Sequence, residues 1–118
     1  MRTLYRHHRY PFKVWDWSEL PQSWGWRLSP TLSDDDLLAR VRHELGEIMG
    51  AHLDSSSSRR PLPLKRRIEL TQTRAFARQF AKCANEKGTA PLWTGLVAID
   101  DDLAFLKYLD VLLPHMWT

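Results

Sequence analysis

A triplet of aspartates followed by a helical apolar pattern is the strongest structural constraint in this sequence. Ser33 precedes the aspartates at positions 34–36, where side-chain oxygens can cap the free N–H groups of a helix and carboxylates favour the positive end of its dipole. The apolar residues that follow recur at spacings of three and four: Leu37, Leu38, Val41, Leu45, Ile48 and Met49. The sequence therefore predicts an amphipathic helix over residues 33–53 with one face packed against another element.

Two glycines interrupt this predicted helix. Gly46 and Gly50 each weaken a helix interior by about 1 kcal/mol relative to alanine. Such positions either cost stability or mark the close approach of another element. After this helix, Asp54 and the serines at 55–58 offer no apolar surface to bury, so we expect an exposed loop over residues 54–62.

A second aspartate triplet, at positions 100–102, precedes another leucine-rich pattern. Its apolar residues are Leu103, Phe105, Leu106, Leu109, Leu112 and Leu113. Pro114 cannot continue a helix and is expected to end it. The apolar run at 96–99 just before the triplet is short enough for one buried strand. We therefore expect a short strand and a helix within residues 96–113.

Between the two aspartate triplets the chain is strongly basic. Residues 59–87 hold nine Lys and Arg against two Glu, whereas the net charge of the whole chain is only +3. Pro63 suits the start of a helix and Gly88 the position after its end, so a helix is predicted over residues 63–87. A cationic stripe should lie opposite its buried side. This stripe comprises Arg67, Arg74, Arg78 and Lys82.

The first 32 residues carry four of the six tryptophans of the chain. Trp15 and Trp17 alternate along an extended stretch, and Trp24 and Trp26 repeat the spacing after a turn-forming segment, which favours a β-hairpin. The expected fold is mainly α with a small β element (α+β), in which three amphipathic helices pack with this N-terminal aromatic β-hairpin. A chain of 118 residues has the size of one domain, so residues 1–118 are expected to form a single domain.

One motif suggests metal chemistry. Residues 43–52 read His-Glu-Leu-Gly-Glu-Ile-Met-Gly-Ala-His and resemble the zincin metalloprotease helix, whose pattern is His-Glu-x-x-His. Glu47 stands where the second histidine would be, and His52 falls one position short of the third ligand. The resemblance implies a small zinc-dependent enzyme. The alternative is an amphipathic helix with solvated His and Glu side chains. We favour this alternative and therefore expect no bound metal.

Other chemistries have little support. The single cysteine, Cys83, cannot form an internal disulfide, and the predicted helix places it on the buried side as a core thiol rather than a nucleophile. No glycine-rich phosphate loop, signal peptide or transmembrane segment is recognisable. We therefore expect a cytoplasmic protein that is not an enzyme and has no catalytic residues and no cofactor.

The features that remain favour binding. Tryptophan and arginine often anchor protein interfaces, and clustered cations speed association with acidic surfaces. We expect a small binding protein of the immunity, antitoxin or inhibitor kind, whose partner is a protein with an acidic patch. Its expected contact residues are Trp15, Trp17, Trp24, Trp26, Arg67, Arg74, Arg78 and Lys82. The alternative is a nucleic-acid-associated accessory protein that uses the basic helix on phosphates.

Overall fold

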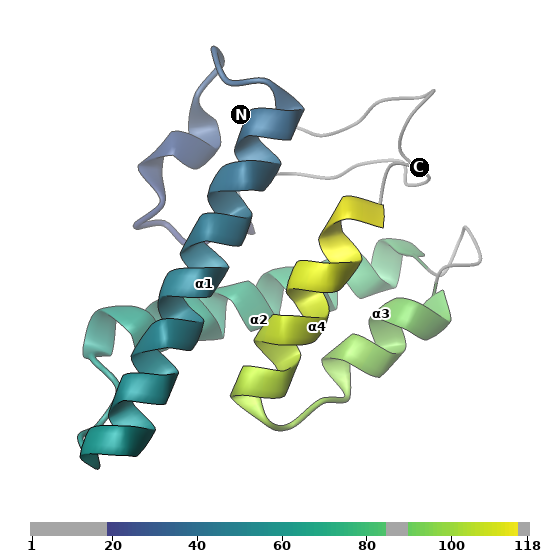
Figure 1. The fold of residues 1–118 in the computed structure, drawn as a ribbon. Helices are drawn as coiled ribbons and strands as arrows, with labels where there is room; N and C mark the ends of the chain where they lie inside the picture. The colour runs from purple at the N-terminus through teal and green to yellow at the C-terminus, as the bar shows by residue number, and fades with distance from the viewer. Residues whose placement is uncertain (1–18, 85–89, 116–118) are drawn as a thin grey trace.

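The computed structural model describes residues 19–84 and 90–115, and this part of the chain is helical (Figure 1). A short 3₁₀ helix, η2, precedes four α-helices, and a second 3₁₀ turn, η3, follows them. In chain order the elements are η2 (Gly25–Leu28), α1 (Asp34–Ser58), α2 (Leu64–Ala84), α3 (Ala90–Val97), α4 (Asp102–Leu112) and η3 (Leu113–His115).

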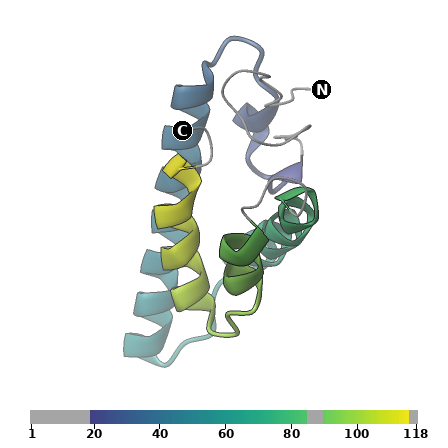
Figure 2. The same cartoon turned by 90° about the vertical axis from the view of Figure 1, so that its right-hand side faces the viewer.

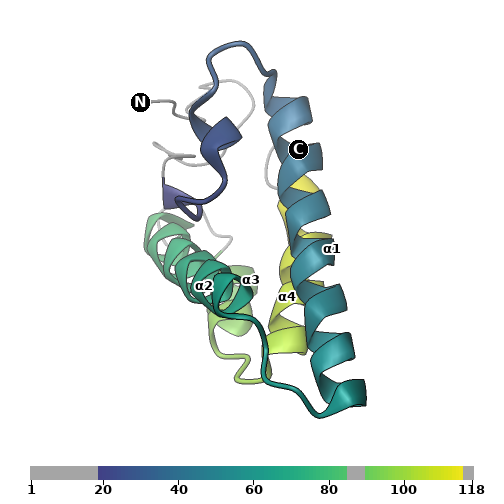
Figure 3. The same ribbon diagram turned by 90° about the vertical axis from the view of Figure 1, so that its left-hand side faces the viewer.

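The helices form two layers. Helices α1 and α4 lie side by side, while α2 and α3 form a second layer that crosses behind them (Figures 1 and 2). The segment around η2 lies beside α2, at the end of the molecule where α1 begins (Figure 3). The buried side chains of both layers form one hydrophobic core, which includes Leu37, Leu45, Ile48, Phe76, Phe80, Trp93, Leu96, Phe105 and Leu106.

The start of α1 follows the sequence pattern, but its end does not. The Ser33 hydroxyl accepts a hydrogen bond from the Asp36 N–H at 3.1 Å, as the predicted cap requires. The helix continues through Ser58 and ends where Arg59 adopts a left-handed conformation with φ of 57°. The predicted helix end at residue 53 and the loop over 54–62 are therefore wrong for residues 54–58. Serine, although it also suits loops, is accommodated here because the Ser58 hydroxyl donates to the Asp54 carbonyl at 2.7 Å within the last helical turn.

The second aspartate triplet also caps a helix. The Asp101 carboxylate accepts from the Ala104 N–H at 2.8 Å and so begins α4. Helix α4 pairs with α1 through Arg42, which donates to both carboxylate oxygens of Asp110 at 2.9 and 3.3 Å. These hydrogen bonds and the charge of Asp110 raise the pKa of Arg42 above its ordinary value.

The strand predicted at residues 96–99 is wrong. Leu96 and Val97 are the last residues of α3, and Leu96 is buried with Trp93 one turn earlier. The Ile99 N–H still bonds to the Leu96 carbonyl, at 3.1 Å, as the helix unwinds. A four-residue apolar run has no period of its own, so only its neighbours decide between strand and helix.

The predicted β-hairpin is not found either, because the described residues contain no strand. Trp24 directly precedes η2 and Trp26 lies within it. Local hydrogen bonds, such as that from the Arg27 N–H to the Trp24 carbonyl at 3.0 Å, replace the cross-strand bonds of a hairpin. Trp15 and Trp17 lie outside the described residues. The α+β class is therefore corrected to an all-helical arrangement for the part of the chain that the structure describes.

The predicted basic helix is confirmed over most of its length, since α2 begins at Leu64 and is described to Ala84.

Within the described ranges, none of the helices combines the length and the apolar composition needed to cross a bilayer.

Candidate partner-binding surface

Arg74 is not a surface cation. Its side chain is only 19% exposed and its Nε donates to the Asp102 carboxylate at 3.0 Å. The two terminal nitrogens donate to the carbonyls of Ile99 and Asp100, each at 3.0 Å. The guanidinium also lies 4.2 Å from the centre of the Phe105 ring. Arg74 thus joins α2 to the start of α4, and its predicted role in partner binding is not supported.

Helix geometry explains why Arg74 differs from its neighbours in the predicted stripe. At 100° per residue, Arg74 lies about 20° further round the helix than Arg67 and about 40° further than Arg78, on the side toward α4. Both of these other arginines are exposed. No ion pair joins Arg67 or Arg78 to a carboxylate of the described residues. The side chain of Lys82 lies outside the described part.

Two apolar side chains share the exposed side of α2 with these cations. Leu64 is 62% exposed and Ile68, one turn later, is 46% exposed. Together with Arg67, Thr71 and Gln72 they line an open hollow of about 250 Å³. The sequence reasoning missed both residues, although their spacing of four on the side opposite the core was a usable signal.

We call this surface the outer face of α2. It comprises Leu64, Arg67, Ile68, Thr71 and Arg78. Further exposed cations lie at its N-terminal end, at Arg59, Arg60 and Lys65. The only acidic residue of α2 is Glu69, which is buried on the opposite side. The outer face therefore combines apolar area with positive charge that no carboxylate of the described residues pairs with.

Glu69 is instead the centre of a buried polar cluster that fixes the η2 segment to α2. Its carboxylate is 1% exposed and accepts from the Trp24 indole N–H at 2.6 Å. The Ser23 hydroxyl donates to the same oxygen at 3.1 Å, and the Arg66 guanidinium donates to the other at 2.8 Å. Paired in this way, the buried carboxylate is satisfied by the fold and is not free for chemistry.

Trp24 is therefore a core residue, and its predicted role as a surface anchor is not supported. It is 1% exposed and stacks on Trp26, with ring centres 5.8 Å apart and planes inclined by 11°. Trp26 is partly exposed and has the guanidinium of Arg40 above it, 5.9 Å from the ring centre. Of the four predicted tryptophan anchors, Trp26 is the one that the described structure leaves partly accessible, while Trp15 and Trp17 lie outside it.

The zincin-like motif does not assemble a metal site in the described residues. His43 and Glu47 lie one turn apart on exposed parts of α1, with His43 Nε2 3.4 Å from Glu47 Oε1. No group of three metal-binding side chains occurs among the residues that the structure describes. The side chain of Cys83 is outside that part, so its predicted burial is untested.

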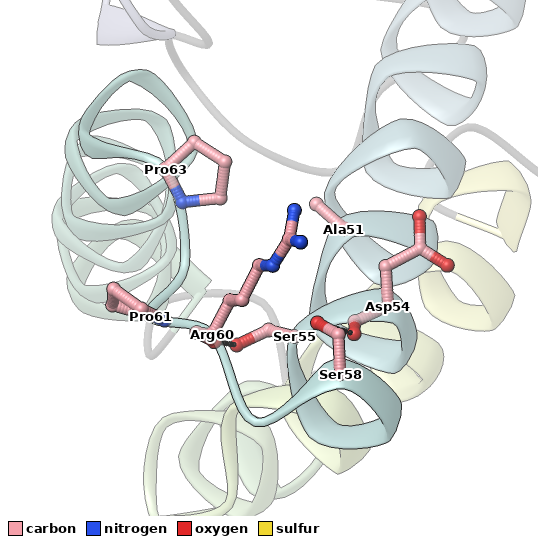
Figure 4. Close-up of a pocket in the computed structure, with 7 residues that line it drawn as sticks. All are labelled: Ala51, Asp54, Ser55, Ser58, Arg60, Pro61 and Pro63. Atoms are coloured by element: carbon pink, nitrogen blue, oxygen red, sulfur yellow. Dashed lines mark hydrogen bonds between the residues drawn. The ribbon is translucent and has the colours of Figure 1, made fainter.

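A second hollow, of about 230 Å³, lies where α1 turns toward α2 (Figure 4). The Arg60 side chain extends across it toward Ala51, with Pro63 on the other side (Figure 4). The hydroxyls of Ser55 and Ser58 both donate to backbone carbonyls. These hydroxyls serve the end of α1 and give the hollow no activated nucleophile.

Comparison with known proteins adds no further constraint, since no protein family, no curated protein and no solved structure matches this chain.

Proposed function

We propose that this protein works by binding another protein that carries an acidic surface patch, and that the outer face of α2 makes the contact. The observation that carries the proposal is the exposure of Leu64 and Ile68 beside Arg67 and Arg78, which form no ion pair with a carboxylate of the described residues. Apolar area of this kind gains free energy when a partner covers it. The cations would orient the partner and speed its association.

This surface replaces part of the interface expected from sequence. Arg67 and Arg78 remain in the proposed contact, whereas Trp24 and Arg74 are held by the fold. Leu64 and Ile68 take over the role of apolar anchors. Immunity, antitoxin and inhibitor proteins act through contacts of this kind, and we propose such a role in the cytoplasm.

A nucleic-acid-binding role has less support from the same residues. Phosphate recognition depends on the number of cations that reach the backbone, and Arg74 is committed to Asp102 and two carbonyls. The exposed pair Leu64 and Ile68 gains nothing from phosphates. The apolar component of the outer face therefore favours a protein partner.

Site-specific cross-linking tests the proposal. A photo-reactive amino acid is placed at Thr71 on the outer face, and at exposed Lys107 on α4 as the control position. Cross-linking is carried out in cells that produce the protein, and the products are treated with nuclease and analysed by mass spectrometry. We expect a protein adduct from position 71 that is absent from position 107. Adding Arg67→Glu and Ile68→Asp to the position-71 chain should abolish the adduct.

Three results would overturn it. These are adducts to nucleic acid only, the same adducts from both positions, or a protein adduct that survives the double substitution. Every substituted residue is exposed, so we expect each variant to keep its helices. Circular dichroism of each variant checks this expectation.

A further inference from the structure

The exposed residues along α2 follow the spacing of a helix-pairing seam. Leu64, Ile68, Thr71, Ala75 and Arg78 are separated by four, three, four and three residues. This is the 3.5-residue period by which one helix keeps a single stripe against a partner helix. We call these five residues the outer seam. Four of them are exposed and Ala75 is partly exposed, so nothing in the described structure covers the stripe.

The positions beside the outer seam are basic or neutral. In a paired helix the residues just before and just after the seam residues face the charged flanks of the partner. Arg67 occupies one flank next to Ile68, and Lys65 occupies the other next to Leu64. Farther along, Arg74 is bound to Asp102, while Gln72 and Gln79 carry no charge. A partner helix that complements this surface would therefore carry acidic residues on both sides of its own apolar stripe, near the Leu64 end of the outer seam.

From this arrangement we propose that the outer seam binds an amphipathic acidic helix of another protein, which deepens the proposed function and rests on it. Apolar side chains of that helix fill the hollow beside Leu64 and Ile68, and its carboxylates pair with Arg67 and Lys65. The seam covers 15 residues from Leu64 to Arg78, and the 14 rises between them give a length of about 21 Å at 1.5 Å per residue. About four turns of partner helix cover this length.

A second copy of α2 is a poor occupant of the same seam. The only acidic residue of α2, Glu69, is buried on the opposite side, so neither of two such helices would offer a carboxylate to pair with the cations of the other. The charge complementarity of the surface thus selects a different chain.

Three synthetic 21-residue helices test the inference on the full chain. The first has leucine at the seam positions and glutamate on both flanks. The second keeps the leucines and has lysine flanks. The third keeps the glutamates and has serine in the seam. Calorimetry and ¹⁵N chemical shifts should show binding of the first peptide, with shifts centred on residues 64–78, and at least tenfold weaker binding of the other two.

Substitutions then separate the apolar and the charged contributions. Ile68→Asp should weaken binding of the glutamate-flanked leucine peptide at least tenfold, while Val111→Asp, at an exposed apolar residue of α4, should leave it unchanged. Lys65→Glu plus Arg67→Glu should reverse the preference, so that the lysine-flanked peptide binds better than the glutamate-flanked one.

Four results would overturn the inference. These are equal binding of the serine and leucine peptides, no effect of Ile68→Asp, tighter binding of a 20-base-pair DNA duplex at the same seam, or a homodimer in sedimentation that Ile68→Asp disrupts. If position 71 cross-links to a protein in cells but the peptides show no preference, the helix inference fails and the proposed function stands. If neither occurs, both fail.

Discussion

At the scale of single residues, two charged side chains each join α2 to a segment that is distant in the sequence. Glu69 is buried and receives three side-chain donors, and Arg74 is mostly buried and serves three acceptors. Neither arrangement was predictable from the sequence, because the partners of Glu69 lie up to 46 residues away and those of Arg74 up to 28. Composition and period place a charged residue on a helix but do not identify such distant partners.

Replacing Glu69 with glutamine should destabilise the protein. The amide has only one acceptor oxygen, so either Trp24 or Arg66 would then face an N–H₂ group in a buried site. The expected loss in the free energy of unfolding is about 1–3 kcal/mol, measured by urea denaturation. Glu47→Gln on the exposed side of α1 is the matched control and should change stability by less than about 0.5 kcal/mol. Equal effects of the two substitutions would contradict the structural role of Glu69.

Arg74→Lys should also be costly although the charge is kept. A single ammonium cannot reproduce the fork that reaches Asp102 and two carbonyls, nor the stacking on Phe105. We expect a loss of about 1.5–3 kcal/mol, the range for hydrogen bonds to charged groups, read from thermal or urea unfolding. Arg67→Lys, on the exposed side of the same helix, should be neutral within about 0.5 kcal/mol. A neutral Arg74→Lys would show that the fork is not needed.

At the scale of elements, the starts of α1, α2 and α4 were predictable, whereas the end of α1 and the whole of α3 were not. Ser33 and Asp101 cap their helices through contacts within three residues, so the signal is local. The end of α1 depends on hydroxyls that also suit a loop, and the fate of residues 96–99 depends on Trp93 packing against Phe80, 4.4 Å away between ring centres. The outer face was half predicted, since its cations were recognised from the helix period but its exposed apolar residues, Leu64 and Ile68, were not.

The glycines of α1 give a test at this scale. A Cβ atom added at Gly46 or Gly50 meets nothing within 4 Å, so neither glycine is needed for a close approach within the described structure. Gly46→Ala and Gly50→Ala should each therefore stabilise the protein by about 0.5–1 kcal/mol through the helix propensity of alanine. Chemical denaturation measures the effect. A destabilised variant would mean that another element or chain packs on this side of α1 in solution.

At the scale of the whole molecule, the layer formed by α2 and α3 is stabilised by the packing of buried side chains rather than by the helix propensity of α3. Helix α3 has eight residues, which is too short to be stable alone, so its folding must come from packing on α2 and the other layer. Trp93 and Leu96 provide that packing from within the core. The ion pair between Arg42 and Asp110 joins α1 to α4 within the first layer, but it is exposed and worth at most about 1 kcal/mol.

Trp93→Ala should therefore affect the whole molecule. Truncating a fully buried aromatic side chain costs about 3–5 kcal/mol, a large part of the 5–15 kcal/mol that stabilises a domain. We expect a much lower urea midpoint, with the loss of α3 visible as rapid amide exchange at residues 92–97 before global unfolding. Leu92→Ala changes the adjacent, exposed residue of the same helix and should alter the midpoint little. If Trp93→Ala changes the midpoint as little as Leu92→Ala does, the contact of Trp93 between the layers does not stabilise the molecule.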